Sequence, residues 1–260
     1  MNRGNNMIVA FIQARLGGST RLGKPKIIQE IVKGKTVVEL VYDRVKQSKL
    51  INEVFCVIPN NEMELEILLT KLKIKYLTGE PNDVLKRFYD CNEIVQADHI
   101  VRITADNPLI DPIVIDEVIS KHLEENNDFT TNAFLERETY PDGYDVAVVK
   151  KDVLKDVYIK AMGKHREHVL TYIQEYEKDY KIGILNCNPY LPYLRLTLDY
   201  IEDLWVIENV YQKLYKKNKY FGFQEVYDLW LKEPQIFNLN AKHVRNEGYY
   251  KENKTIEVTE

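Results

Sequence analysis

The chain has 260 residues, 45% of them hydrophobic, which is enough to bury the core of one large α/β domain or two small ones. Its formal net charge of −4 argues against the basic surface that binds nucleic acid. The three scattered cysteines argue for a reducing cytoplasm and against a disulfide framework or a zinc site. No apolar run reaches the ~20 residues of a membrane span, and residues 1–6 lack the apolar core of a signal peptide. We therefore expect a cytoplasmic protein that binds neither nucleic acid nor membrane.

A short apolar run, Ile8–Ile12, predicts a buried first strand, and a glycine-rich turn follows it. Backbone N–H groups of such a turn converge on an anion, and nearby cationic side chains add positive charge. A polyphosphate fits this arrangement better than the alternative, an ordinary surface loop with solvated basic residues. The turn residues are Gly17, Gly18, Ser19 and Thr20, and the cations are Arg15, Arg21 and Lys24.

The run Gly18–Lys24 also has the G-x-x-x-x-G-K spacing of a P-loop. In a P-loop the next residue is Ser or Thr, whose hydroxyl binds Mg²⁺. Here it is Pro25, which offers neither a hydroxyl nor an N–H. The sequence therefore argues against a P-loop kinase.

Helical and strand patterns alternate after this loop. A β-α-β-α-β order implies a mostly parallel sheet with right-handed crossovers, whose ligands bind beyond the carboxyl ends of the strands. The glycine-rich loop lies at that edge. The predicted elements are helix 36–46, strand 54–58, helix 62–72, strand 74–77 and a helix from 83 to 96, which Asp83 or Asn82 can cap.

The apolar run Ile100–Leu109 predicts a strand that ends at Asp106, where Pro108 favours an extended turn. A carboxylate at that edge, facing a triphosphate loop, is suited to hold Mg²⁺. The competing role is to cap the next helix. Asp111 suits that role better, because Pro112 then takes the first helical position. We therefore expect Asp106 to be free for a metal.

The second half predicts a helix at 113–125, a strand at 129–132, a turn at Pro141-Asp142-Gly143 and helices at 151–161 and 165–177. Strands at 180–186 and 193–199 follow, the second ending at Asp199, and then helices at 202–217 and 223–232. His165 and His168 have the spacing of zinc ligands, but no clear third ligand accompanies them.

Five motifs, in order, resemble those of a known family. The first loop resembles the A-R-x-x-S-T-R-L-P-G-K-P pattern of CMP-Kdo synthetases. It resembles the loop of the spore-coat polysaccharide cytidylyltransferase-like family even more closely. Residues 79–88 resemble G-x-x-x-D-V-L-x-R-F, 101–112 resemble V-R-I-T-x-D-x-P-L-I-D-P, 140–146 resemble Y-P-D-G-x-D-V, and 194–204 resemble L-R-x-T-x-D-x-x-E-D-L. The resemblance extends over about Ile8–Asn240.

The departures from the family pattern are local. There is an extra glycine before Ser19, and the proline before Gly23 is missing. Ala147 stands where the family usually carries a glutamate, and Tyr200-Ile201 replaces Thr-Pro.

The resemblance implies a mixed, mostly parallel α/β sheet flanked by helices, of the nucleotide-diphospho-sugar transferase type (GT-A-like Rossmann). It implies a single nucleotidyltransferase domain over residues 1–240, in which 129–186 add the sugar-binding part and a dimer contact. Residues 241–260 are a polar tail without a recognised counterpart. The implied reaction joins CTP and an acidic sugar, of the ulosonic or nonulosonic type, to give a CMP-sugar and pyrophosphate. Mg²⁺ is the implied cofactor and a homodimer the implied assembly.

The site residues follow from the motifs and from their chemistry. We expect Arg15, Arg21 and Lys24 to hold the leaving phosphates, and Asp106 and Asp199 to hold Mg²⁺. The expected nucleotide contacts are Gln13, Ala14, Gly17, Gly18, Ser19, Asp83, Arg87 and Thr104. The expected sugar contacts are Arg102, Asn132, Asp142, Asp145, Arg166, His168 and Arg195, whose arginines suit a carboxylate. No general base is assigned.

Three other functions compete with this one. A nucleotidyltransferase that uses another NTP, such as GTP, with a sugar 1-phosphate would carry a similar basic loop. A GT-A-type glycosyltransferase commonly holds its metal with Asp-x-Asp, which Asp106-Asn107-Pro108 does not supply. A regulatory protein without catalysis has no need of both candidate metal acids.

Overall fold

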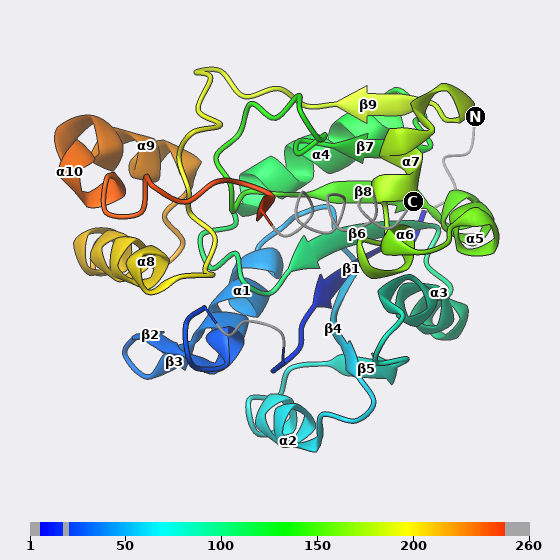
Figure 1. The fold of residues 1–260 in the computed structure, drawn as a ribbon, viewed down its shortest axis with the longest axis horizontal. Coiled ribbons are helices and arrows are strands. Elements are labelled where there is room, and N and C mark those ends of the chain that lie inside the picture. Colours follow the sequence, from blue (N-terminus) through cyan, green and yellow to red (C-terminus); the bar gives the residue numbers. More distant parts are fainter. Residues whose placement is uncertain (1–5, 18–20, 248–260) are drawn as a thin grey trace, which may run out of the picture.

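The computed structural model describes residues 6–17 and 21–247. A seven-stranded sheet in the order β5-β4-β1-β6-β8-β7-β9 forms its centre (Figure 1). Strand β1 (Ile8–Gln13) pairs in parallel with β4 (Glu53–Pro59) on one side and with β6 (His99–Thr104) on the other. Within the described residues, no helix is both long and apolar enough to cross a membrane.

The other strands extend the sheet on both sides of this centre. Strand β5 (Tyr76–Gly79) pairs in parallel with β4, and β8 (Ala147–Lys150) runs antiparallel to both β6 and β7 (Phe129–Thr131). Strand β9 (Ile182–Ile184) is parallel to β7. The prediction of a mixed, mostly parallel sheet is therefore confirmed.

Helices cover both faces of the sheet, which is why β1 is apolar on both sides and nearly all buried. One face packs against α1 (Val37–Val45), α2 (Met63–Lys71), α4 (Pro112–Glu124), α8 (Ile201–Leu214) and α9 (Phe223–Lys232). The other face packs against α3 (Val84–Val95), α5 (Lys151–Lys160) and α7 (Thr171–Glu175). The two shorter helices are α6 (Lys164–Glu167) and α10 (Pro234–Phe237).

The helix starts follow from local side chains. Asp111 caps α4 by accepting from the N–H of Ile113 at 2.7 Å, with Pro112 at the first helical position as predicted. Asp83 caps α3 by accepting from the N–H of Lys86. Asp199 does not cap α8, because Asp203 takes the N–H groups of Asp199 and Tyr200 instead. Asp199 is therefore left for the site.

Two sequence predictions differ from the structure, and some elements were not predicted. The helix expected at 165–177 is broken into α6, α7 and a short 3-10 turn, because Val169 adopts a left-handed φ of 51°. Residues 193–199 form no strand but an extended segment that makes one bridge, Asp142 to Arg195. The β2–β3 hairpin (Glu30–Val32 and Lys35–Thr36), near the 3-10 turn Lys26–Ile28, and β8 were not predicted.

Gly143 explains how that extended segment is held. Its φ is +108°, and an added Cβ would lie 2.5 Å from the backbone carbon of Leu196. Only glycine allows the 140–146 turn to lie directly against residues 194–197. The turn thereby brings Asp142 beside Arg195.

Candidate active site

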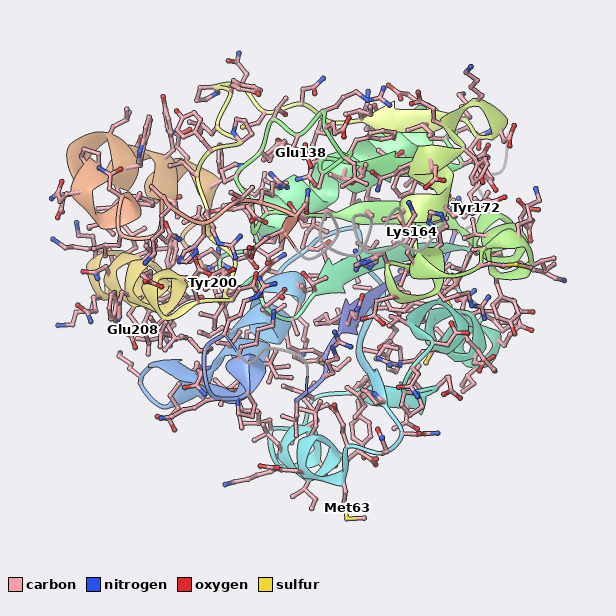
Figure 2. The ribbon with its side chains drawn as sticks, viewed as in Figure 1. Met63, Glu138, Lys164, Tyr172, Tyr200 and Glu208 are labelled. Atoms are coloured by element: carbon pink, nitrogen blue, oxygen red, sulfur yellow. The ribbon has the colours of Figure 1, made fainter. Side chains whose placement is uncertain are left out.

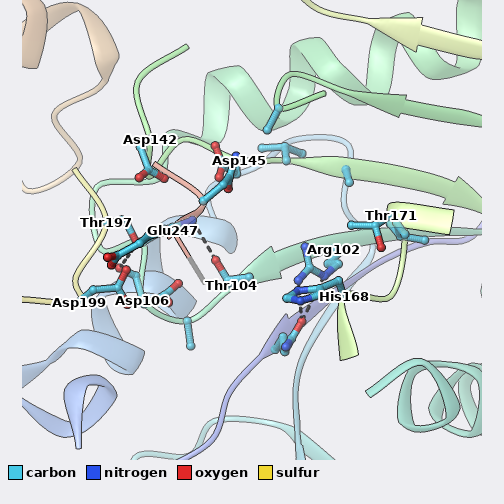
Figure 3. Close-up of a pocket in the computed structure, with 18 of the residues that line it drawn as sticks. Arg102, Thr104, Asp106, Asp142, Asp145, His168, Thr171, Thr197, Asp199 and Glu247 are labelled. Carbon is cyan, nitrogen blue, oxygen red and sulfur yellow. Dashed lines mark hydrogen bonds between the residues drawn. The ribbon is translucent and has the colours of Figure 1, made fainter. Parts of the chain in front are cut away.

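A cavity of about 420 Å³ lies at the carboxyl ends of β1 and β6, as the sheet topology predicts (Figure 3). Its two ends differ in charge. Figure 3 shows aspartates and Glu247 at one end and Arg102 with His168 at the other. The acidic end is lined by Asp106, Asp142, Asp145, Asp199 and Glu247, with Lys26 between two of them, and the basic end by Arg102, His168 and Thr171, with Gln13 bonded to Arg102.

A lysine bridges the two predicted metal ligands. The ammonium nitrogen of Lys26 lies 2.5 Å from Oδ2 of Asp106 and 2.8 Å from Oδ1 of Asp199. Burial would lower the pKa of Lys26, but the two carboxylates raise it above its ordinary value. Burial would likewise raise the pKa of Asp199, yet Lys26 and Arg195 hold it below its ordinary value. Lys26 and Asp199 are therefore both charged at neutral pH.

Arg195 connects the aspartates of the acidic end through hydrogen bonds. Its guanidinium donates to Asp142, Asp199 and Asp203 at distances of 2.6 to 3.2 Å. Burial and the neighbouring Asp145 raise the pKa of Asp142 to about 7, against the opposite effects of Arg245 and Arg195. The guanidinium of Arg195 therefore already binds carboxylates of the protein itself.

Arg102 has a different environment at the basic end. Its guanidinium donates twice to the side-chain oxygen of Gln13, at 2.8 and 3.1 Å. Among the described residues, no carboxylate lies within ion-pair distance of it. Burial lowers its pKa, although an arginine stays charged at neutral pH. By contrast Arg15 pairs with Glu167 at 3.1 Å and Arg21 with Glu247 at 3.4 Å.

The C-terminal segment Asn240–Glu247 also reaches the cavity, although its sequence gave no sign of this. Arg245 donates to Asp145 at 2.6 Å and to the carbonyl of Tyr140 at 2.8 Å. Val244, Asn246 and Glu247 line the cavity directly. A polar segment without a recognised motif offers no local signal for such contacts.

The structure brings most of the predicted site residues to this cavity. These are Gln13, Arg15, Gly17, Arg21, Arg102, Thr104, Asp106, Asp142, Asp145, His168, Arg195 and Asp199. Gly18 and Ser19 lie outside the described residues. Ala14 is buried, with its N–H bonded to the carbonyl of Val57.

Besides Ala14, five predicted residues do not line the cavity. Lys24 is exposed, and Lys26, two positions later, occupies the site instead. The sequence contained Lys26 next to the recognised loop, but nothing in the motif distinguished it. The other four serve neighbouring segments: Arg87 donates to the carbonyls of Glu80 and Pro81, Asn132 to that of Tyr144, and Arg166 pairs with Asp83 at 2.5 Å.

The described residues contain no group of three or more His, Cys, Asp or Glu that could bind a metal without help. The Nδ1 of His165 lies 2.9 Å from the hydroxyl oxygen of Thr171. Asp106 and Asp199 nevertheless offer oxygen ligands of the type Mg²⁺ prefers, and Lys26 shows that positive charge is accommodated between them. A metal held here needs further oxygens from a bound substrate.

Comparisons with known proteins show the family of this chain. The family model described as cytidylyltransferase matches residues 9–254. The spore coat polysaccharide biosynthesis protein SpsF of Bacillus subtilis is 31% identical over 220 residues, covering 80% of this chain and 88% of that protein. A 3-deoxy-manno-octulosonate cytidylyltransferase of Geotalea daltonii is 24% identical over 229 residues, covering 79% and 87%. The resemblance drawn from the motifs is therefore confirmed.

A solved structure shows the same fold. A cytidylyltransferase from Leptospira borgpetersenii superposes with a TM-score of 0.83 at 26% identity, covering 92% of this chain and 98% of that one. Nearly the whole described chain therefore shares one architecture with that enzyme.

Proposed function

Because this chain belongs to the cytidylyltransferase family, we propose that it transfers CMP from CTP to an acidic sugar and releases pyrophosphate. The acceptor class is an eight- or nine-carbon ulosonic acid. The product would serve the synthesis of a surface polysaccharide or glycan, as the name of the Bacillus subtilis relative indicates for that protein. A homodimer, with contacts from residues 129–186, is part of the proposal.

The observation that carries the acidic acceptor is the guanidinium of Arg102, which is half-buried in the cavity wall. Asp106 and Asp145 act on this guanidinium only from a distance, and no carboxylate of the described residues contacts it, so the half-buried position favours an anionic ligand. A guanidinium binds a carboxylate with two parallel hydrogen bonds, which fixes the orientation of the ligand. Arg166 and Arg195, the other arginines predicted for this role, already pair with aspartates. Arg102 therefore supports recognition of the acceptor's carboxylate.

Other cations and carboxylates that line the cavity support the phosphate chemistry. In such a transfer a sugar hydroxyl attacks the α-phosphorus, and catalysis rests on positioning and on neutralising charge. Arg15, Arg21 and Lys26 would orient the triphosphate, and Asp106 and Asp199 would hold Mg²⁺. Mg²⁺, when bound, neutralises phosphate charge and lowers the pKa of a coordinated hydroxyl.

The test is pyrophosphate release from purified protein with each of the four NTPs and a set of acceptors. We expect turnover with CTP, Mg²⁺ and an acid such as 3-deoxy-manno-octulosonate or N-acetylneuraminate. Turnover of GTP with a neutral hexosamine 1-phosphate, and none with CTP, would replace the proposal with the sugar 1-phosphate alternative.

The variant Arg102→Met tests whether Arg102 recognises the carboxylate of the acceptor. The variant should lose about tenfold or more in kcat/KM for the acid, because a charged hydrogen bond is lost, while CTP binding stays intact. An unchanged preference for the acid would contradict the role of Arg102.

A further inference from the structure

The C-terminal segment Asn240–Glu247 follows the last helix, α10 (Figure 1), and its Glu247 lies at the acidic end of the cavity (Figure 3). Asn240 and His243 hold its beginning. Asn240 donates to Asp203 at 2.8 Å and to the carbonyl of Arg195 at 2.9 Å. His243 stacks on Tyr200 with ring centroids 3.6 Å apart and planes within 7°. The path of the segment is therefore fixed before it reaches the cavity.

Its end is fixed by contacts from opposite sides. Figure 2 labels Glu138 and Tyr200 on either side of the segment. Asn246 donates to Glu138 at 2.9 Å, while Glu247 accepts from the hydroxyl of Tyr200. A segment held at both ends by side chains of the domain is part of the cavity wall and not a loose tail.

Arg245 lies at the centre of this wall and faces acids. Beyond its bond to Asp145, its Nε is 3.9 Å from Asp142 and 4.0 Å from Glu138, and its side chain is only 13% exposed. Its Nε is buried and makes no hydrogen bond. Two of the acids, Asp142 and Asp145, line the cavity. Without Arg245 they would repel each other at close range.

Fixed carboxylates recognise a polyhydroxy ligand, because each oxygen accepts a hydrogen bond from a hydroxyl. The acidic end lies next to Asp106 and Asp199, where the proposed transfer takes place. A sugar hydroxyl bound by Asp142 or Asp145 would therefore lie near the phosphate chemistry.

Resting on the proposed function, we infer that segment Asn240–Glu247 forms the acceptor side of the cavity. Within it, Arg245 is a positioning residue that fixes Asp145 and Asp142 for the hydroxyl groups of the acceptor sugar. Nothing in the reaction of CTP alone requires this arrangement, so its effects should be confined to the acceptor.

The experiment compares wild type, Arg245→Gln, Arg245→Lys and Lys242→Ala in the pyrophosphate assay with CTP and 3-deoxy-manno-octulosonate. Lys242 is the matched control, since it lies in the same segment, is 65% exposed and pairs with Glu202, outside the cavity. Arg245→Gln should raise the acceptor KM about tenfold, as expected for the loss of a charged hydrogen bond, and leave the CTP KM within about twofold. Arg245→Lys should recover part of the loss, and Lys242→Ala should behave as wild type.

The pH dependence of the acceptor KM separates positioning from a general loss of structure. Asp145, Asp199, Arg195 and Arg245 all act on Asp142. Removing Arg245 should therefore move the pH at which the acceptor KM changes upward, whereas a loosened fold would expose Asp142 and move that pH downward, because burial is the main cause of its raised pKa.

The outcomes are distinguishable. Equal rises in both KM values, or the same KM and pH profile in Arg245→Gln as in wild type, overturn the inference and leave the proposed function standing. Absence of pyrophosphate release by wild type with CTP and every acid in the set overturns both.

Discussion

Replacing Lys26 tests the centre of the site most directly. Its ammonium separates Asp106 and Asp199, and the three side chains are between 20 and 26% exposed. Lys26→Ala leaves two facing carboxylates without their shared cation. Breaking a buried ion pair by removing one partner lowers the free energy of unfolding by about 3–5 kcal/mol. Because these side chains are partly exposed, we expect a loss at the lower end of that range. A transition state that loses one such electrostatic contact rises by about 3 kcal/mol, or roughly 100-fold in kcat.

The assay measures kcat from pyrophosphate release and the free energy of unfolding from urea titration, with and without Mg²⁺. Millimolar Mg²⁺ should restore part of the lost stability of Lys26→Ala, because the cation can take the vacated place between the carboxylates. Lys24→Ala is the matched control, since Lys24 is exposed and does not line the cavity. A Lys24→Ala variant that loses as much activity as Lys26→Ala would refute this account of the site.

Three further predictions concern the surrounding structure. Asp199→Asn should fold normally by circular dichroism yet lose about 100-fold in Mg²⁺-dependent turnover; a fully active variant would remove Asp199 from the metal site. His122, buried beside His99, has its pKa lowered to about 3, first by burial. Below pH ~6.5 the unfolded chain binds a proton at His122 that the folded chain does not. The free energy of unfolding therefore decreases as the pH is lowered, by about 2 kcal/mol at pH 5. Urea titrations at pH 5 and 7 should show a smaller difference for His122→Gln, and an equal one would contradict the assignment. Gly143→Ala should lose at least about 2 kcal/mol of stability because of its positive φ and the contact with Leu196, and an unchanged melting temperature would disprove this.

The sequence by itself determined the elements whose signals are local. Apolar periodicity predicted β1, β4, β6 and most helices within a few residues, because burial of one face leaves a repeating pattern. Asp111 and Pro112 predicted the start of α4 because a cap is satisfied within three residues. The order of the motifs determined the family, and the βα alternation placed Asp106 at the edge where ligands bind.

Tertiary structure decided which side chains meet. Lys26 reaches Asp106 and Asp199 across 80 and 173 residues, and Arg245 reaches Asp145 across 100. Ion pairs between such distant positions leave no periodic pattern, so the motif pointed to Lys24 and the C-terminal segment gave no sign of its contacts. Likewise Arg87 and Arg166 resembled ligand contacts until the fold showed the carbonyls and the aspartate that engage them. The sequence gives the chemical type of each side chain, but its contacts depend on chain segments that only the fold brings together.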